Sequence, residues 1–371
     1  MSKSLDIIFF GLTLSSSWGN GHATTFRALI QGLDAQAHRV LFLERDVPWY
    51  ADSRDLPDPN FCELSYYSDI DVMLQSYRDR LQSADAVIVG SYVPSGVELI
   101  DRLAGMGLKR LCFYDIDTPV TLAKLDRGDD EYLARRQMPL FDAYFSFSGG
   151  DVLTRLEKGY GVRKALALYC SVDAGRYENT GEDYRWDLGY LGTYSPDRQP
   201  TLDKLLIQPA RRLPHLRFVV AGPQYPDEID WPANVDRIDH LPPAEHPNFY
   251  SRQRFTLNVT RADMIAAGWS PSVRLFEASA CRTAIISDHW RGLDELLPDG
   301  QAIVIAHRTE DVINVLEELV EADRRSLADT AHKIVLENHT GLARARGLAA
   351  DLEQVTEHVS QPVLPPHRIP A

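Results

Sequence analysis

The sequence has no long apolar run. None of its segments reaches the roughly 18 to 20 consecutive apolar residues that a membrane-spanning helix needs. Its first ten residues, MSKSLDIIFF, lead directly into a strand-like segment, without the apolar stretch and the small-residue cleavage site of a secretory signal. From these absences we expect a cytoplasmic protein without a transmembrane segment.

Cysteine is scarce, and its spacing argues against two common uses. The four cysteines lie far apart in the sequence, and three of them lie in or beside apolar segments, where a thiol packs as a small hydrophobic group. They are Cys62, Cys112, Cys170 and Cys281. Neither a zinc site nor a disulfide framework is indicated, and we expect no metal centre.

Positive charge is in deficit. The chain has 39 Lys and Arg against 53 Asp and Glu, which gives a formal net charge of -14 at pH 7. A field of this sign repels phosphate backbones, whose neutralisation supplies most of the affinity for nucleic acids. We therefore expect no nucleic-acid partner, although a local pocket for a small anion remains compatible with this charge.

What is present is a repeated alternation of short apolar segments with helical patterns, which predicts parallel strands joined by helical crossovers. The predicted strands are Ile7–Leu12, Arg39–Leu43, Ala86–Gly90, Arg110–Tyr114, Ala143–Ser146 and Ala165–Tyr169 in the first half, then Leu188–Leu191, Arg217–Ala221, Val235–Ile238, Phe255–Val259, Ala284–Ser287 and Ala302–Ile305. The predicted helices are Thr24–Leu33, Asp71–Gln82, Ser95–Ala104, Asp130–Arg136, Gly150–Glu157, Gln199–Arg212, Ser272–Ala280, Asp311–Leu319, Arg324–Asn338 and Thr340–His358.

The alternation stops at a polar segment, 171–185, and then restarts. Because 371 residues exceed what one ordinary core supports, we predict two domains. The expected fold is α/β, with two doubly wound parallel sheets of Rossmann-like architecture facing a cleft between their strand carboxyl ends. The boundaries are 1–172 for the first domain and 186–339 for the second. The helix at 340–358 is expected to cross back to the first domain, and the proline-rich 359–371 to form an extended tail.

The segment AGWSPSVRLFEASACRTAIISDHWRGLDELL, 267–297, gives the strongest local pattern. Ser270 suits an N-cap and Pro271 the first helical position, so a helix should begin there with its positive dipole end toward the cleft, which favours a phosphate. Ser272 adds a hydroxyl and Arg274 a guanidinium fork. Glu277 lies among core residues and accepts from two adjacent hydroxyls, such as those of a ribose. The alternative is a simple intrahelical Arg274–Glu277 ion pair.

This segment resembles the donor-site segment of GT-B glycosyltransferases, most closely that of the spore-maturation CgeB-like group. In retaining GT-B enzymes a Glu-x7-Glu element opens this helix, its second Glu binds the nucleotide ribose and its first lies beside the sugar. Glu277 matches the second Glu, whereas Trp269 stands where the first would be. The resemblance therefore leaves open the sugar-side contact and whether the anomeric configuration is inverted or retained.

Other loops extend the resemblance over most of the chain. In YLGTYSPDR it places Arg198 on the donor diphosphate, and in VVAGPQYP it places Gly222 beside the nucleobase. Arg261, in LNVTRADM, follows another predicted strand and faces the cleft. In SDHWRGLDELL the backbone amides of Arg291 and Gly292 are expected to hold phosphate or sugar hydroxyls.

The first predicted strand is followed by SSSWGNGHATTFRAL, 15–29, an unusually polar loop. By the same resemblance it reaches across the cleft toward the diphosphate and the acceptor. Gly19 and Gly21 allow close approach of the backbone to a ligand, and Asn20 supplies a polar contact together with Ser16 and Ser17. His22 begins the next helix, and its pKa range suits a general base. The alternative is that residues 20–22 only shape a turn and cap the helix.

A second candidate base lies in CFYDIDTPVTL, 112–122. Asp115 and Asp117 alternate at a strand end, so both are expected near the cleft, where either is a candidate to act as a base or to hold acceptor hydroxyls. Thr118 and Pro119 are expected to turn the chain after these residues, and the alternative role of the acids is an Asx turn that caps the strand. Metal binding through the two acids is not compelled.

The resemblance implies a transferase that moves a hexosyl or related group from a nucleoside diphosphate sugar to an acceptor. A UDP-sugar is the expected donor and no other cofactor is expected, while the acceptor is left open among a glycan, a small molecule and a protein. His22 or Asp117 would act at the acceptor. Two alternatives remain, namely a sugar-nucleotide epimerase of the same fold and a non-catalytic nucleotide-sugar-binding protein.

Overall fold

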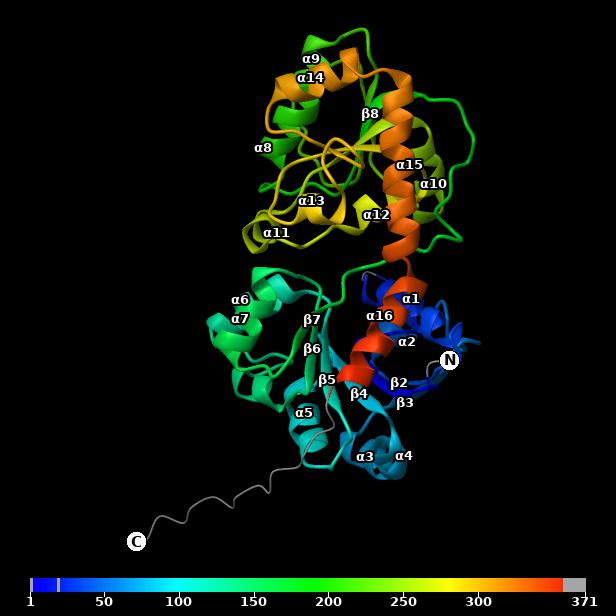
Figure 1. The fold of residues 1–371 in the computed structure, drawn as a ribbon, viewed down its shortest axis with the longest axis vertical. Helices are drawn as coiled ribbons and strands as arrows, with labels where there is room; N and C mark the ends of the chain where they lie inside the picture. Colours follow the sequence, from blue (N-terminus) through cyan, green and yellow to red (C-terminus); the bar gives the residue numbers. More distant parts are fainter. Residues whose placement is uncertain (1–2, 19–20, 356–371) are drawn as a thin grey trace.

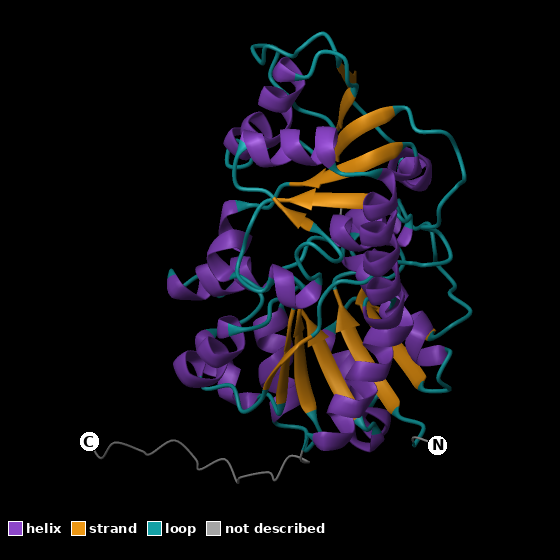
Figure 2. Ribbon diagram, turned by 45° about the horizontal axis from the view of Figure 1, so that its top comes forward, coloured by secondary structure: helices purple, strands orange, loops and turns teal. Residues whose placement is uncertain are grey.

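A computed structural model describes residues 3–18 and 21–355, and its strands form two sheets stacked along the long axis of the molecule (Figures 1 and 2). The first sheet has seven strands in the order β3-β2-β1-β4-β5-β6-β7, and the second has six in the order β10-β9-β8-β11-β12-β13. All pairings within these two sheets are parallel. The predicted fold class, two doubly wound parallel sheets, is confirmed.

The first sheet and its helices occupy the N-terminal half. Its strands are β1 Asp6–Gly11, β2 Arg39–Arg45, β3 Glu63–Tyr67, β4 Ala86–Gly90, β5 Leu111–Asp115, β6 Ala143–Ser146 and β7 Ala165–Ala167. Its helices are α1 His22–Asp34, α2 Pro48–Ala51, α3 Ile70–Ser76, α4 Arg78–Ser83, α5 Gly96–Ala104, α6 Thr118–Asp126 and α7 Asp151–Tyr160, with a 3-10 turn η1 at Arg135–Leu140.

The second sheet follows after the connection at 168–185. Its strands are β8 Trp186–Leu191, β9 Phe218–Ala221, β10 Val235–Ile238, β11 Gln253–Asn258, β12 Ala284–Ser287 and β13 Val304–Ile305. Its helices are α8 Gln199–Leu202, a π-helical turn η2 Asp203–Ile207, α9 Gln208–Arg212, a 3-10 turn η3 Pro243–Glu245, α10 His246–Ser251, α11 Ala262–Ala267, α12 Val273–Ala280, α13 Leu293–Leu296, α14 Thr309–Glu318 and α15 Glu321–Asn338.

Both sheets are covered on both faces, which explains why their central strands read as continuous apolar runs. In β1, five of the six residues are buried, and its side chains alternate between two separate apolar clusters, one on each face. The second sheet likewise separates two clusters. Because the faces are covered by helices, polar loops remain at the two ends of each sheet.

The chain returns to the first sheet at its C-terminal end. α16 (Gly341–Gln354) packs against α1, and its apolar side chains join the cluster under that sheet (Figure 1). The return crossing lies beside the outgoing connection, since Val172 N donates to His339 O over 2.9 Å and Val172 pairs with Thr340. The chain therefore passes between the two sheets twice, in two connecting segments that lie side by side. Residues 356–371 lie outside the described residues.

Several element predictions were wrong. β3 was not predicted, because it is an edge strand whose side chains are mostly half-buried or exposed. The expected helix at 130–136 is absent from that described segment, where only η1 forms. The expected turn at Thr118 and Pro119 is instead the start of α6, with proline in the first turn, where its missing N–H costs nothing. None of the described helices has both the length and the apolar character that a bilayer crossing requires.

Candidate functional site

Two adjoining cavities lie between the sheets. One, of about 520 Å³, is lined by loops of both halves of the chain, and the other, of about 380 Å³, by loops of the second half. They share His246, Ser272, Val273 and Glu277. In the second sheet the lining segments follow the carboxyl ends of β8, β9 and β11, and the arrowheads of the first sheet point toward the same region in Figure 2. The cavities therefore occupy the edge where doubly wound sheets bind ligands.

The helix at the centre of this cleft begins later than predicted. The N-cap of α12 is Ser272, whose hydroxyl accepts from Arg274 N over 3.3 Å, so the N-terminal end of the helix lies at both cavities. Ser270 is buried instead, and its hydroxyl is shared with Ser148 of the first half over 2.5 Å and donates to Gly268 O. The prediction that Ser270 is the N-cap and Pro271 the first helical residue was wrong, because the Ser270 hydroxyl forms a hydrogen bond that links the two halves of the chain.

Four arginines line the two cavities, and none of them forms an ion pair with a carboxylate among the described residues. Three are the predicted Arg198, Arg261 and Arg274, and the fourth, Arg176, comes from the connection at 168–185. Arg274 donates to Leu191 O over 2.5 Å and to Asn258 Oδ1 over 3.1 Å, which excludes the simple pair with Glu277 as its principal contact. Uncompensated guanidinium groups around a cleft favour an anionic ligand.

Of these four arginines, Arg198 has the environment that is least favourable for a charged side chain. Its side chain is buried, its Nη2 donates to Thr193 O over 2.6 Å, and its Nε has no hydrogen-bond partner within the described part of the chain. Burial lowers the pKa of Arg198, and the like charges of Arg274 and Arg261 lower it further. A ligand oxyanion would relieve both penalties at once.

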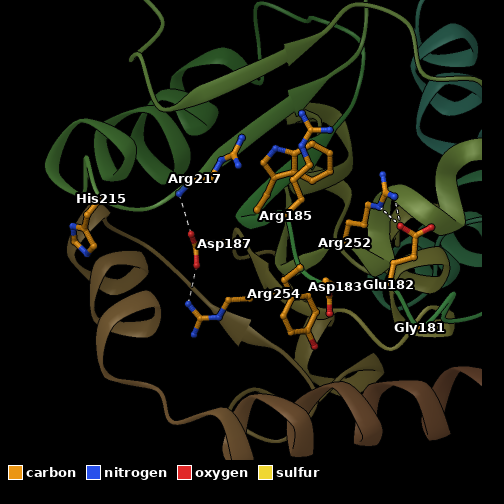
Figure 3. Close-up of a pocket in the computed structure, with 11 residues that line it drawn as sticks. Gly181, Glu182, Asp183, Arg185, Asp187, His215, Arg217, Arg252 and Arg254 are labelled. Carbon is orange, nitrogen blue, oxygen red and sulfur yellow. Dashed lines mark hydrogen bonds and ion pairs between the residues drawn. The ribbon is translucent and has the colours of Figure 1, made fainter.

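A larger hollow at the opposite edge of the second sheet provides a contrast (Figure 3). It has a volume of about 950 Å³ and lies at the amino ends of β8, β9 and β11. Its four arginines are all paired with carboxylates: Arg185 and Arg217 with Asp236, Arg252 with Glu182, and Arg254 with Asp187. Because these charges are already neutralised, the size of this hollow does not make it the better anion site.

Glu277 lies one turn into α12, on the wall shared by the two cavities. Tyr250 donates a hydrogen bond from its hydroxyl to Glu277 Oε2 over 3.2 Å. Burial raises the pKa of the Tyr177 phenol, and the nearby Glu277 carboxylate raises it further. The Tyr250 hydroxyl thus holds the Glu277 carboxylate at the wall of both cavities. The carboxylate is therefore available to accept from ligand hydroxyls.

The first half of the chain contributes His22 and Asp117 to the larger cavity. Burial lowers the pKa of His22 to about 4, and its Nδ1 is buried without a hydrogen-bond partner among the described residues. Asp117 accepts from Tyr92 Oη over 3.2 Å, and burial raises the pKa of its carboxyl above the usual value. The Tyr92 ring also meets the His22 ring edge-on, with centroids 5.3 Å apart. Tyr92 was not predicted.

Asp115 does not reach the cavities, contrary to expectation. It is fully buried at the end of β5, where it accepts from Tyr144 over 2.6 Å, from Thr121 over 2.7 Å and from the amide of Asp117 over 3.2 Å. Burial raises the pKa of Asp115 to about 6. For this residue the alternative, an Asx-type turn that shapes the strand end, describes the structure.

The serine-rich loop after β1 is held mainly by protein contacts. The buried carboxylate of Glu44 accepts from Leu14 N over 2.6 Å and from the amide and hydroxyl of Ser15 over 2.9 and 2.6 Å. Ser16 donates to Ser53 O, and Ser17 binds Asp55, so their expected ligand contacts are replaced by anchoring contacts. Gly21 is the N-cap of α1 and lines the larger cavity, while the expected contacts of Gly19 and Asn20 lie outside the described residues.

The remaining predicted residues divide between the cleft and its border. Gly222 lines the smaller cavity, with φ at 140°, and a Cβ there would lie 2.1 Å from Gly192 O. Arg291 and Gly292 line neither cavity. Arg291 pairs with Asp151 over 2.5 Å, and Gly292 lies against the ring of Trp269. Nothing in the sequence distinguished Arg176, His246 or Tyr250, all of which line the cleft.

Comparisons with known proteins agree with this architecture. Residues 198–350 match the model of a family described as Glycosyl transferase-like. No curated protein sequence matches the chain. Among solved structures, sucrose-phosphate synthase from Thermosynechococcus elongatus superposes with a TM-score of 0.67 at 10% identity, covering 94% of this chain and 98% of that one.

Two further similar structures contain a nucleotide sugar. HepE from Anabaena, in complex with UDP-glucose, gives a TM-score of 0.63 at 13% identity over 94% of this chain and 100% of that chain. BGT of phage T4, in complex with its UDP-glucose substrate, gives 0.58 at 10% identity over 95% and 99%. This chain therefore has the two-sheet fold of GT-B glycosyltransferases, with a glycosyl-transferase-like family match in its C-terminal half.

Proposed function

We propose that this chain is a glycosyltransferase that moves a sugar from a nucleoside diphosphate sugar to an acceptor hydroxyl. The observation that carries this proposal is the group of cleft arginines that pair with no carboxylate in the described part of the chain, at the N-terminal end of α12, in a protein of net charge -14. A diphosphate leaving group develops negative charge as its bond to the sugar breaks. Fixed guanidinium groups and a helix dipole at that position would stabilise this charge.

The donor contacts that we propose follow from the lining of the smaller cavity. Arg198, Arg261 and Arg274 would hold the diphosphate with Ser272, and Gly222 would allow close approach of the nucleobase. Glu277 would accept from the ribose hydroxyls. Ser270 is left out of this donor site because its hydroxyl is shared with Ser148, and Arg291 and Gly292 are left out because they line neither cavity.

The acceptor would enter from the side of the first sheet. His22 and Asp117 line the larger cavity, and each carries an atom able to take a proton from an acceptor hydroxyl. Gly21 borders the same space, and we retain Gly19 and Asn20 as proposed neighbours of the ligand. The acceptor itself stays open among a glycan, a small molecule and a protein.

Within this function, a UDP-sugar is the proposed donor, since two of the similar structures are complexes with UDP-glucose. A resemblance to the CgeB-like group is likewise kept as a proposal. The neighbours named above favour neither a sugar-nucleotide epimerase nor a non-catalytic binding protein. Incubating UDP-glucose without any acceptor tests the first of these, because an epimerase would return an isomerised UDP-sugar.

Thermal unfolding with UDP tests the donor site directly. A ligand that binds only the folded state adds about 2.7 kcal/mol of stability at 100 times its Kd, so UDP should raise the melting temperature of the wild type. Arg198→Gln should abolish most of this rise, and Glu277→Ala should weaken it. Arg217→Gln, which removes an arginine from the hollow in Figure 3, should leave it unchanged. Equal responses of all four proteins would remove the cleft arginines from the site.

A further inference from the structure

Tyr92 adopts a backbone conformation that an aromatic residue rarely occupies. It lies just after β4, at the carboxyl edge of the first sheet, with φ at 62° in the left-handed region. The segment is tied to the end of the neighbouring strand β5, since Ser91 N donates to Tyr114 O over 3.0 Å and Ser91 Oγ accepts from Ile116 N over 3.1 Å. Strain of this kind persists where the surroundings determine it, and it concentrates at functional sites.

The side chain of Tyr92 connects the two acceptor-side candidates. Its hydroxyl donates to Asp117 Oδ2 over 3.2 Å, and its ring packs edge-on against His22 at an interplanar angle of 89°. Behind it, the Tyr132 ring lies 4.5 Å away, and Lys124 Nζ lies 5.1 Å from the Tyr92 ring centroid. The strained residue is thus the one that sets where the Asp117 carboxylate lies relative to the cavity.

His22 and Asp117 differ in the hydrogen bonds that orient the atom that would accept a proton. The buried Nδ1 of His22 has no partner among residues 3–18 and 21–355, so no hydrogen bond to that atom selects a tautomer. Asp117 is oriented by the Tyr92 hydroxyl and is faced by further charged groups. These are Lys124 on its own helix α6, Arg261 from the second half of the chain and the buried Asp115 beneath it.

We infer that Asp117 is the general base of the transfer, that Tyr92 is the positioning residue which holds its carboxylate toward the acceptor, and that His22 is an uncharged wall of the site. This inference rests on the proposed function. In the step, the acceptor hydroxyl gives its proton to an Asp117 oxygen and its oxygen bonds to the anomeric carbon. The bond from that carbon to the diphosphate breaks, and the electron pair leaves with the diphosphate beside the cleft arginines.

A carboxyl-carbon NMR titration tests the positioning role without requiring turnover. The chain is labelled with ¹³C-aspartate, and the Asp117 signal is assigned as the one missing from Asp117→Asn. Tyr92→Phe keeps the ring against His22 but removes the donated hydrogen bond, so the Asp117 titration should move to higher pH by about half a unit or more. Tyr77→Phe, the control, removes a phenol hydroxyl that meets Ser65 elsewhere in the same half of the chain, and it should leave the Asp117 titration in place. An unmoved titration in Tyr92→Phe, or equal movement in both variants, would overturn the inference.

Release of UDP from UDP-glucose, with water as acceptor, tests the catalytic role. Tyr92→Phe should lower kcat by roughly tenfold with little change in KM, and the acid limb of its pH profile should move upward together with the NMR titration. An acid limb that stays in place in Tyr92→Phe and disappears in His22→Gln would assign the base to His22 instead. UDP-induced stabilisation separates the failure of this inference from the failure of the proposed function. If UDP stabilises the wild type but the Asp117 titration is unchanged in Tyr92→Phe, only this inference fails. If UDP does not stabilise the wild type, the proposed function fails.

Discussion

At the scale of single residues, Arg198 differs from the arginines that form structural ion pairs. Most arginines on this protein's surface meet a carboxylate, as Arg254 meets Asp187 over 3.0 Å, and such pairs contribute little net stability. Arg198 is buried beside two further arginines, and its Nε has no hydrogen-bond partner among the described residues. The fold gains no stability from that arrangement, and under the proposed function an oxyanion of the donor would compensate it.

His22 gives a prediction about pH. Burial lowers its pKa from 6.5 to about 4 in the folded protein, so the folded state binds fewer protons than the unfolded state between these values. The contribution of His22 to the free energy of unfolding is therefore fully present above pH 6.5 and is lost as the pH falls toward 4. The loss is on the order of 3 kcal/mol. In urea unfolding, His22→Gln should lose less stability than the wild type between pH 7 and pH 4. Parallel pH dependences of the two proteins would contradict the burial of a neutral imidazole.

The positions of residues at the cleft could be predicted where they depend on local sequence, whereas a predicted role was wrong where it depends on a distant partner. Glu277 and Arg198 could be placed at the cleft because they sit at fixed offsets from a helix start and a strand end. The role of Ser270 was wrong because its partner, Ser148, is 122 residues away. Tyr92 carries no sequence signal, since its importance comes from its backbone angle and from Asp117, neither of which is visible before folding.

At the scale of elements, the interior strands of both sheets were predicted, and so was the half-buried edge strand β10, whereas the edge strand β3 was missed. The run Ile7-Ile8-Phe9-Phe10 is buried on both faces and reads as a strand from composition alone. β3, with the sequence ELSYY, lies at the edge and mixes exposed with half-buried positions, so it gives no such run. Short helices such as α11 and α13 were also missed, because one or two turns carry too little periodicity to be recognised.

The turn after β9 gives a prediction at this scale. Gly222 has φ at 140°, and a Cβ there would lie 2.1 Å from Gly192 O, in the neighbouring loop after β8. Gly222→Ala should therefore cost about 2–4 kcal/mol and reduce the stabilisation by UDP, because both loops line the donor cavity. Gly181→Ala is the matched control, since Gly181 also has a positive φ, 72°, but has no atom within 4 Å of the added Cβ. It should cost only about 1 kcal/mol. Similar losses in urea unfolding would show that the contact with Gly192 is unimportant.

At the scale of the whole molecule, the two-sheet architecture was predictable because the alternation of strands and helices stops at 171–185 and begins again. The return of the C-terminal helix to the first sheet was expected, but the other contacts that join the two sheets were not predictable. Ser148 meets Ser270, Arg291 meets Asp151, and α11 packs on α6, all between residues more than 100 positions apart. Such contacts depend on the mutual placement of two finished sheets, and local patterns carry no information about that placement.

Trp269 is central to this junction, and its replacement tests how the sheets are held together. Its indole Nε1 donates to Glu295 over 2.8 Å, its carbonyl accepts from Gly149 N over 2.9 Å, and a Cβ on Gly150 would lie 2.1 Å from its ring. Trp269 lines neither cavity, so Trp269→Ala should speed amide hydrogen exchange around 149–151 while leaving the stabilisation by UDP nearly unchanged. Arg291→Ala removes the exposed pair with Asp151, a 3.4 Å hydrogen bond to Ala266 O and a cation–π contact with the Trp269 ring, but it leaves the indole in place, so it should alter that exchange less. If Trp269→Ala instead abolishes a difference between UDP-glucose and UDP, the indole acts at the sugar and its role between the sheets is secondary.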